Sequence, residues 1–180
     1  MIIQIIEKLQ RSIQLNRLNK HPHSSVGSIK IGIANHFTLY PDAKKIVLGE
    51  QLVFRNYIHI IVQNQAELSI GNNVFFNNFC SINCLEKIEI GENTLFGENV
   101  KLYDHNHQYQ TEPHFQVSHS EFNTAPIIIG KNCWLGSNVT VLKGVTIGDN
   151  CIIGTGCVIY KNIPANSTVV NQQNLIKKIR

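Results

Sequence analysis

The chain has 180 residues, 43% of them hydrophobic, which is enough for one domain with a sizeable core. The formal net charge of +4 provides no basic stripe of the kind that nucleic acid requires, although it suits a small ligand that carries phosphate. The first apolar run is broken by Gln4 and Glu7 and does not resemble a signal peptide, and no apolar stretch approaches the roughly 20 residues that span a membrane.

The N-terminal segment has helical periodicity. Ile and Leu recur at roughly helical spacing from Ile2 to Leu18, with charged residues such as Lys8 and Arg11 between them. This pattern predicts an amphipathic helix of about eighteen residues, which Pro22 ends. We expect residues 1–22 to cover the open apolar end of a repeat domain, because repeat proteins need such caps. Peripheral binding of this helix to a membrane is the alternative, since Lys and Arg flank its apolar face.

A period of six residues dominates the rest of the chain. The clearest run of apolar residues at every sixth place is Ile129, Leu135, Val141, Ile147, Ile153 and Ile159. A period of six fits neither a helix nor a plain strand, and it is typical of a hexapeptide β-helix, in which each sextet supplies one flat strand and one corner. Gly directly after the apolar residue, and Asn or Gly three places on, predict corners that demand a positive φ.

Three sextets make a coil of eighteen residues. Five coils are clear, beginning at Leu48, Ile70, Ile90, Ile129 and Ile147. A sixth, weaker coil is expected between residues 29 and 47. The step from Ile90 to Ile129 is twenty-one residues longer than one coil, so a long loop over 103–126 should leave the solenoid. The predicted fold is an all-β solenoid of five to six coils over residues 23–165, followed by a basic tail over 166–180.

The cysteines follow the repeat. Cys80, Cys133, Cys151 and Cys157 occupy the fifth place of a sextet, which elsewhere holds Val or Thr. A small buried side chain suits that place, so we interpret these four as core residues rather than as disulfides or metal ligands. Cys84 lies in a stretched sextet, and its role stays open. Reduced cysteines without a signal peptide favour the cytoplasm.

We expect the chemistry in the long loop, because a regular solenoid has little reason to extrude so many residues. The loop contains His105, His107, His114 and His119, half of the eight histidines of the chain. Histidine accepts a proton near neutral pH, so a histidine here is a candidate general base. Solvated surface histidines are the alternative, above all for His114 and His119. A zinc site of the His-x-His type is another, but no third ligand has a fixed spacing.

The repeat resembles that of the hexapeptide-repeat acyltransferases. The segment Ile127 to Pro164, together with residues 70–107, is similar to the galactoside, maltose and streptogramin O-acetyltransferase branch. The resemblance implies a left-handed parallel β-helix, a homotrimer, and transfer of an acyl group from a coenzyme A thioester to a hydroxyl or amine, with no metal. The Tyr-Asp-His-Asn-His form of the loop and the short N-terminal helix look more like the acetyltransferases that decorate capsule, exopolysaccharide or lipopolysaccharide sugars.

The family's catalytic residues fall on particular positions of this sequence. Counted from the Ile90 sextet, the catalytic histidine corresponds to His107, with His105 as the fallback. The resemblance implies that it takes the proton of an acceptor hydroxyl and that the backbone N–H of Ser137 stabilises the oxyanion. Asn78 corresponds to an asparagine that holds the acceptor, although a plain corner residue is the alternative. The other expected acceptor-binding residues are His105, Tyr103 and Trp134, and the expected coenzyme-binding residues are Ser137, Thr155, Gly156, Tyr160, Lys161, Lys178 and Arg180.

The sequence thus predicts a cytoplasmic, acetyl-CoA-dependent sugar O-acetyltransferase of surface-polysaccharide synthesis, located at the inner face of the membrane if its helix binds lipid. N-transfer to an amino sugar, or transfer to another small acceptor such as an antibiotic or serine, is the alternative. Two further alternatives are a zinc protein like the γ-class carbonic anhydrases and a non-catalytic β-helix. The family's Gly-x-Pro-Ala-Lys near the C-terminus is replaced here by Asn171 to Lys177, so the path of the tail is not predicted.

Overall fold

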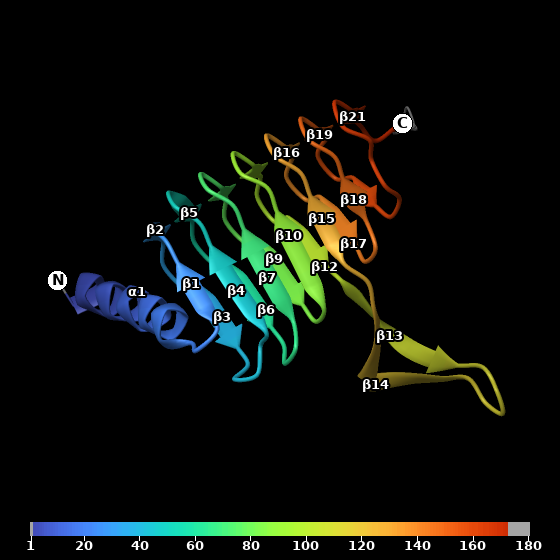
Figure 1. Cartoon of the computed structure of the whole chain (residues 1–180), viewed down its shortest axis with the longest axis horizontal. Helices are drawn as coiled ribbons and strands as arrows, with labels where there is room; N and C mark the ends of the chain where they lie inside the picture. The colour runs from blue at the N-terminus through green and yellow to red at the C-terminus, as the bar shows by residue number, and fades with distance from the viewer. Residues whose placement is uncertain (1, 173–180) are drawn as a thin grey trace, which may run out of the picture.

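The computed structural model describes residues 2–172 and consists of one helix, a parallel β-solenoid and a projecting hairpin (Figure 1). Helix α1 spans Ile2–Lys20. Sheet A contains β1 (Ser24–Val26), β4 (Lys45–Leu48), β7 (Glu67–Ile70), β10 (Lys87–Ile90), β15 (Ile127–Ile129) and β18 (Thr146–Ile147). Sheet B contains β2 (Ile29–Ile31), β5 (Leu52–Phe54), β8 (Phe75–Phe76), β11 (Leu95–Phe96), β16 (Trp134–Leu135), β19 (Ile152–Ile153) and β21 (Thr168–Val169). Sheet C contains β3 (His36–Leu39), β6 (His59–Val62), β9 (Ser81–Cys84), β12 (Lys101–Tyr103), β17 (Thr140–Leu142) and β20 (Val158–Ile159).

Each coil contributes one strand to each of the three sheets, and all pairings between coils are parallel. The predicted left-handed parallel β-helix of about six coils is therefore confirmed. The weak first coil begins earlier than expected, because Ser24 to Val26 already pair with Ile46 to Leu48. The stack also continues beyond Pro164, since β21 pairs with β19 inside the segment expected to be a tail.

The apolar residues of the six-residue period point inward and form the core. Four phenylalanines stack through successive coils of sheets B and C, with ring centroids 5.7 Å apart for Phe37 and Phe54, 5.1 Å for Phe54 and Phe76, and 4.5 Å for Phe76 and Phe96. All four side chains are buried. Burial of each such side chain contributes roughly 1.5–3 kcal/mol, so the core fixes the register of the coils and places the corner residues at set positions.

Asparagines and glycines serve different purposes at the corners. Asn73, Asn93, Asn132 and Asn150 have positive φ as predicted, and their amides form a ladder along the edge between sheets A and B. The prediction is wrong for the glycines after the inward residues, because among the described glycines only Gly144 and Gly156 have positive φ. Steric crowding explains why position 97 is a glycine, because a Cβ there would lie 2.6 Å from the backbone nitrogen of Ser137 in the next coil.

All five cysteines are buried free thiols, including Cys84. Burial raises the pKa of the Cys80 thiol to about 11, and it also raises the pKa of Cys133 and Cys157.

We expect thiol reagents at neutral pH to label the folded protein very slowly and the denatured protein rapidly, because thiolate is the reactive form and these thiols are inaccessible. Rapid labelling of Cys151 and Cys157 in the native state would show that these side chains do not point into the core.

Helix α1 packs on the solenoid only near its C-terminal end. Leu18 is buried and Leu15 is partly buried against the core, and the backbone N–H of Phe37 in β3 donates to Gln14 Oε1 at 3.1 Å. The Ile and Leu residues from Ile3 to Ile13 are exposed, so only the last turns of the helix cover the end of the solenoid. Within residues 2–172, no helix combines the length and the apolar character needed to cross a membrane.

Candidate active site

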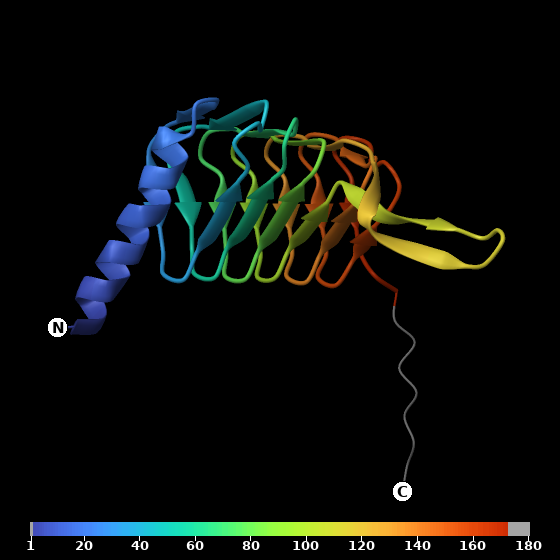
Figure 2. The same cartoon turned by 90° about the horizontal axis from the view of Figure 1, so that it is seen from below.

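The long loop forms an antiparallel hairpin of β13 (His105–Gln110) and β14 (Gln116–Thr124). It leaves the solenoid where β12 of sheet C would turn toward sheet A, at the edge that we call the C–A edge. The hairpin points away from the stacked coils (Figure 2). The register of the two strands shifts between His107 and Tyr109, so the pairing is irregular next to the candidate base.

Asp104 anchors the base of the hairpin. Its carboxylate is fully buried and accepts the backbone N–H groups of Leu85, Glu86 and Lys87 at 2.8–3.0 Å, in the turn between β9 and β10 of the preceding coil. Charge-assisted hydrogen bonds of this kind are stronger than neutral ones. The carboxylate therefore fixes the backbone directly before His105 and sets the direction in which the hairpin leaves.

His107 is held in a form that suits a general base. Its Nδ1 lies 3.0 Å from the backbone carbonyl oxygen of Ser118, on the opposite strand of the hairpin. A carbonyl oxygen only accepts, so in the neutral imidazole Nδ1 carries the proton and Nε2 has its lone pair free. The ring packs at 4.7 Å on Phe122, and the residue is exposed to solvent. His107 can therefore accept a proton at Nε2 from a group in solution.

His105 has a more enclosed environment. Its side chain is 17% exposed, and Nδ1 lies 3.3 Å from Asp104 Oδ1. The ring meets Phe122 edge-on at 5.2 Å and Tyr103 edge-on at 6.2 Å. This packing links the expected acceptor residues Tyr103 and His105 to the base of the hairpin, and of His105 and His107 the latter is the more exposed.

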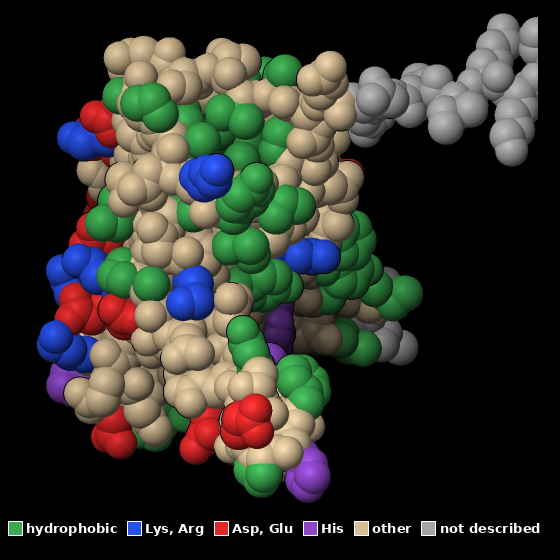
Figure 3. Space-filling view, turned by 90° about the vertical axis from the view of Figure 1, so that its right-hand side faces the viewer, with side chains coloured by type: hydrophobic (Ala, Val, Ile, Leu, Met, Phe, Trp, Pro, Cys, Tyr) green, Lys and Arg blue, Asp and Glu red, His purple; other side chains and the backbone are tan. Residues whose placement is uncertain are grey.

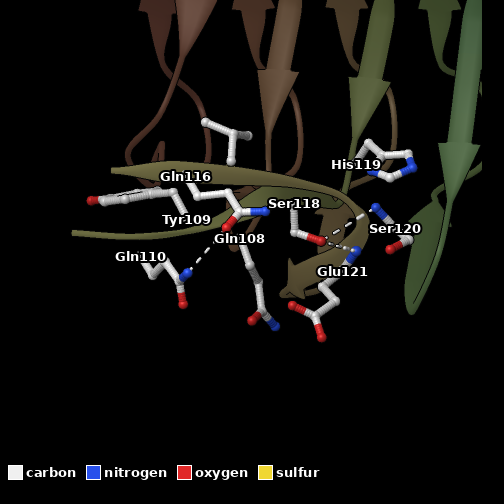
Figure 4. Close-up of a pocket in the computed structure, with 9 residues that line it drawn as sticks. Gln108, Tyr109, Gln110, Gln116, Ser118, His119, Ser120 and Glu121 are labelled. Carbon is white, nitrogen blue, oxygen red and sulfur yellow. Dashed lines mark hydrogen bonds between the residues drawn. The ribbon is translucent and has the colours of Figure 1, made fainter. Parts of the chain in front are cut away.

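The hairpin contains a polar hollow of about 370 Å³, lined by residues 108–110 and 116–121 (Figure 4). Ser118 Oγ accepts the N–H of Ser120 at 3.4 Å and the N–H of Glu121 at 3.1 Å, within the irregular part of β14 whose Ser118 carbonyl contacts His107. His119 lines the same hollow and is exposed, and His114 is exposed as well. Neither residue has a described contact that distinguishes it from a solvated surface histidine.

Ser137 lies on a different edge of the prism, between sheets B and C, which we call the B–C edge. Its Oγ accepts the N–H of Glu98 at 3.2 Å, and its carbonyl accepts the N–H of Gly156 at 2.9 Å. Within residues 2–172, its own N–H has no hydrogen-bond acceptor. A backbone donor left free at a surface corner is what an oxyanion site requires.

Asn78 stands on the same B–C edge as a rung of the corner ladder. Its Oδ1 accepts the N–H of Asn56 at 3.2 Å, and its Nδ2 donates to Glu98 Oε1 at 3.1 Å. In the fold, Asn78 is therefore a corner residue, which was the alternative interpretation of this position. The remaining amide hydrogen and oxygen lone pair leave it able to bind an acceptor as well.

Trp134 lies on the outer face of sheet B, as expected, and 53% of its surface is exposed. In the parallel register it stands between Leu95 and Ile152, both exposed, so the three side chains form an apolar strip. From the end of the molecule that carries the hairpin, hydrophobic side chains are seen to gather on the surface above the hairpin, with isolated Lys or Arg side chains among them (Figure 3).

The expected coenzyme residues fall on two edges. Thr155 and Gly156 are exposed on the B–C edge, in the coil next to Ser137. Tyr160 and Lys161 follow β20 on the C–A edge, where Lys161 Nζ lies 5.6 Å from the centre of the Tyr160 ring. Lys178 and Arg180 lie outside the described residues.

A single chain does not bring His107 and Ser137 together. Sheet C separates the C–A edge from the B–C edge, and a three-residue strand such as β17 is itself about 10 Å long. The hairpin points away from the solenoid and not back across sheet C (Figure 2). Each chain therefore presents two incomplete halves of the expected site.

Two features near the site were missed by the sequence analysis. Asp104 was assigned no role, although an aspartate directly before His105 is a sequence signal that could have been used. The second is an exposed pair, Tyr57 and Phe79, stacked at 4.9 Å with an interplanar angle of 7° next to Asn78. Both have positive φ, which is strained for bulky residues. The sequence signal for this pair was that Tyr57 and Phe79 occupy the corner position at which other coils have Asn.

A parallel β-solenoid built on a six-residue period is the architecture of the hexapeptide-repeat proteins. A family model described as the hexapeptide repeat of succinyl-transferase matches residues 126–161. WbbJ of Escherichia coli (strain K12), named for O-acetyl transfer in lipopolysaccharide biosynthesis, is 32% identical over 140 residues, which cover 74% of this chain and 71% of WbbJ. The chain therefore belongs to the hexapeptide-repeat acyltransferases.

Two further comparisons concern the sequence and the fold, respectively. The galactoside O-acetyltransferase of E. coli (strain K12) is 38% identical over 101 residues, which cover 56% of this chain and about half (48%) of that enzyme. The solved structure of AntD, an N-acyltransferase from Bacillus cereus in complex with a dTDP-amino sugar and coenzyme A, has the same fold, with a TM-score of 0.69 and 14% identity over 93% of this chain and 90% of AntD. Among the residues that the structure describes, no group of three or more His, Cys, Asp or Glu is arranged to hold a metal.

Proposed function

We propose that this protein transfers an acetyl group from acetyl-CoA to a hydroxyl of a sugar during surface-polysaccharide synthesis. The observation that carries the proposal is the hydrogen bond of His107 Nδ1 to the Ser118 carbonyl, which leaves Nε2 free to act as a base. The relationship to WbbJ supports the saccharide acceptor, and relatives named as acetyltransferases support the acetyl group.

The chemistry then follows from the residues. Nε2 of His107 takes the proton of the acceptor hydroxyl while the hydroxyl oxygen forms a bond to the carbonyl carbon of the thioester. The Ser137 N–H donates to the oxyanion of the tetrahedral intermediate. The carbon–sulfur bond breaks, the thiolate of coenzyme A leaves, and the imidazolium returns its proton to that sulfur. The products are an O-acetyl sugar and free coenzyme A, and the protein is unchanged.

The active site in this proposal is shared between chains of a C3 homotrimer. His107 of one chain approaches Ser137 on the B–C edge of a neighbour and Trp134 on the adjoining face of sheet B, because one chain keeps His107 and Ser137 on separate edges. The coenzyme runs between the two chains, along Thr155 and Gly156 of one chain and Tyr160 and Lys161 of the other. The acceptor sugar sits near Asn78, where the exposed rings of Tyr57 and Phe79 offer a flat apolar surface.

The test is a thiol-release assay with acetyl-CoA and a panel of neutral sugars, amino sugars and serine. We expect coenzyme A release to depend on a sugar hydroxyl and the product to be an ester that hydroxylamine cleaves. An amide product that resists hydroxylamine would establish N-transfer to an amino sugar instead. A protein that binds no coenzyme A by calorimetry would be a non-catalytic β-helix, and the proposal would fail.

A further inference from the structure

The N-terminal part of α1 extends from the end of the solenoid, and its apolar side chains have no partner within residues 2–172. Ile5 is 60% exposed, Ile6 49%, Leu9 60% and Ile13 43%. The helix runs obliquely across the first coil and past the edge of the prism (Figure 2). Between Ile3 and Lys20, the one buried side chain of the helix is Leu18, near the C-terminal end.

The exposed apolar residues lie on the side of the helix that faces away from the solenoid. Leu9 precedes the buried Leu18 by nine residues, which is two and a half helical turns, so the two side chains point in opposite directions. Ile6 and Ile13 lie three and four residues from Leu9 and share its face. An apolar face of this kind is expected to be buried against something other than its own solenoid.

The charges of the helix favour an anionic partner. It contains Lys8, Arg11, Arg17 and Lys20 but a single acidic residue, Glu7. Glu7 precedes Leu18 by eleven residues, about three turns, so it lies on the solenoid side, where it pairs with Arg11 at 3.8 Å. The face with Ile6 and Leu9 thus has basic neighbours and no acidic one. If two copies of this face packed on each other, positive charges would lie beside positive charges along the apolar seam, which disfavours a second copy as the partner.

We propose that α1 docks flat on an anionic lipid surface. The face with Ile5, Ile6, Leu9 and Ile13 enters the boundary between headgroups and acyl chains, while Lys8, Arg17 and Lys20 meet the lipid phosphates. In the proposed C3 trimer all three helices lie at the same end of the assembly and contact one surface together, which multiplies a weak individual affinity. This last step rests on the proposed trimer, whereas the docking of one helix does not.

The experiment is co-sedimentation of the full chain with vesicles of phosphatidylcholine alone or mixed with phosphatidylglycerol. We expect binding to the mixed vesicles that weakens in high salt, because exposed charges are screened. The variant Ile6→Ser/Leu9→Ser should bind at least about tenfold less, since it removes two inserting side chains. The matched control Val158→Ser/Val170→Ser changes two exposed apolar residues at the other end of the solenoid and should bind like the wild type.

Three outcomes would overturn the proposal. The first is wild-type protein that stays in the supernatant with both vesicles. The second is an Ile6→Ser/Leu9→Ser variant that binds as the wild type does while its melting temperature is unchanged. The third is a variant whose oligomer dissociates in light scattering, which would show that the face is covered by a second copy. If the Ile6→Ser/Leu9→Ser variant loses vesicle binding but still transfers acetyl groups to a soluble sugar, the membrane role is supported separately from the catalytic proposal.

Discussion

Replacing His107 by alanine is expected to lower kcat by roughly 10²–10⁴ and to leave coenzyme A binding nearly unchanged. The physical reason is that the acceptor hydroxyl attacks poorly while it keeps its proton, whereas the coenzyme contacts lie on other residues. Steady-state kinetics with saturating acceptor gives kcat, and calorimetry gives the affinity for coenzyme A. His107→Ala with wild-type kcat would remove the general base from the mechanism.

Two matched variants separate the catalytic histidine from its neighbours. His119→Ala changes an exposed histidine on the same hairpin and should keep wild-type kcat. His105→Ala should have an intermediate effect, because it removes a ring that packs between Tyr103 and Phe122 without touching the proton in transfer. If His105→Ala instead loses as much kcat as His107→Ala, the base would have to be reassigned to the histidine beside Asp104.

Asp104→Ala should be the most destabilising substitution near the site, costing more than about 3 kcal/mol of unfolding free energy. It deletes the acceptor of three partly buried backbone N–H groups, those of Leu85, Glu86 and Lys87. Asp104→Asn keeps one oxygen and should cost roughly 1–2 kcal/mol. Chemical denaturation measures both. An Asp104→Ala protein as stable as the wild type would show that the anchor contributes nothing.

A positioning role for Asp104 has a separate signature. Asp104→Asn should fold and trimerise, yet lose kcat at saturating acetyl-CoA because the hairpin that carries His107 is no longer fixed at its base. The affinity for coenzyme A should change little. A purely structural role would lower stability without moving kcat in the folded fraction, and that result would limit Asp104 to the fold.

The fold was predictable because one side chain per sextet decides it. Ile129, Leu135 and Val141 occur at a spacing that buries them only in a parallel β-helix, and the structure has each of them in the core. The place of the long loop followed from the same count. The loop's conformation did not, because the β13–β14 pairing depends on contacts such as that of His107 with Ser118, which no periodicity encodes.

The candidate site was predictable only as separate parts. Resemblance assigned His107 and Ser137, but the sequence alone did not show that they stand on different edges of the prism. The roles of the glycines were also misjudged, since close approach of the next coil, as at Gly97, is a tertiary effect. The outward apolar face of α1 was equally hidden, because helical spacing does not say which face meets the solenoid.

The most direct test of the shared site is co-expression of two inactive variants. His107→Ala lacks the base, and Ser137→Pro lacks the N–H proposed to hold the oxyanion. Each should be a folded trimer with little activity alone. In trimers mixed at equal amounts, about a quarter of the sites combine an intact His107 from one chain with an intact Ser137 edge from its neighbour, so activity should return to roughly a quarter of the wild-type value. Mixed trimers that remain as inactive as either parent would place the whole site within one chain and contradict the account.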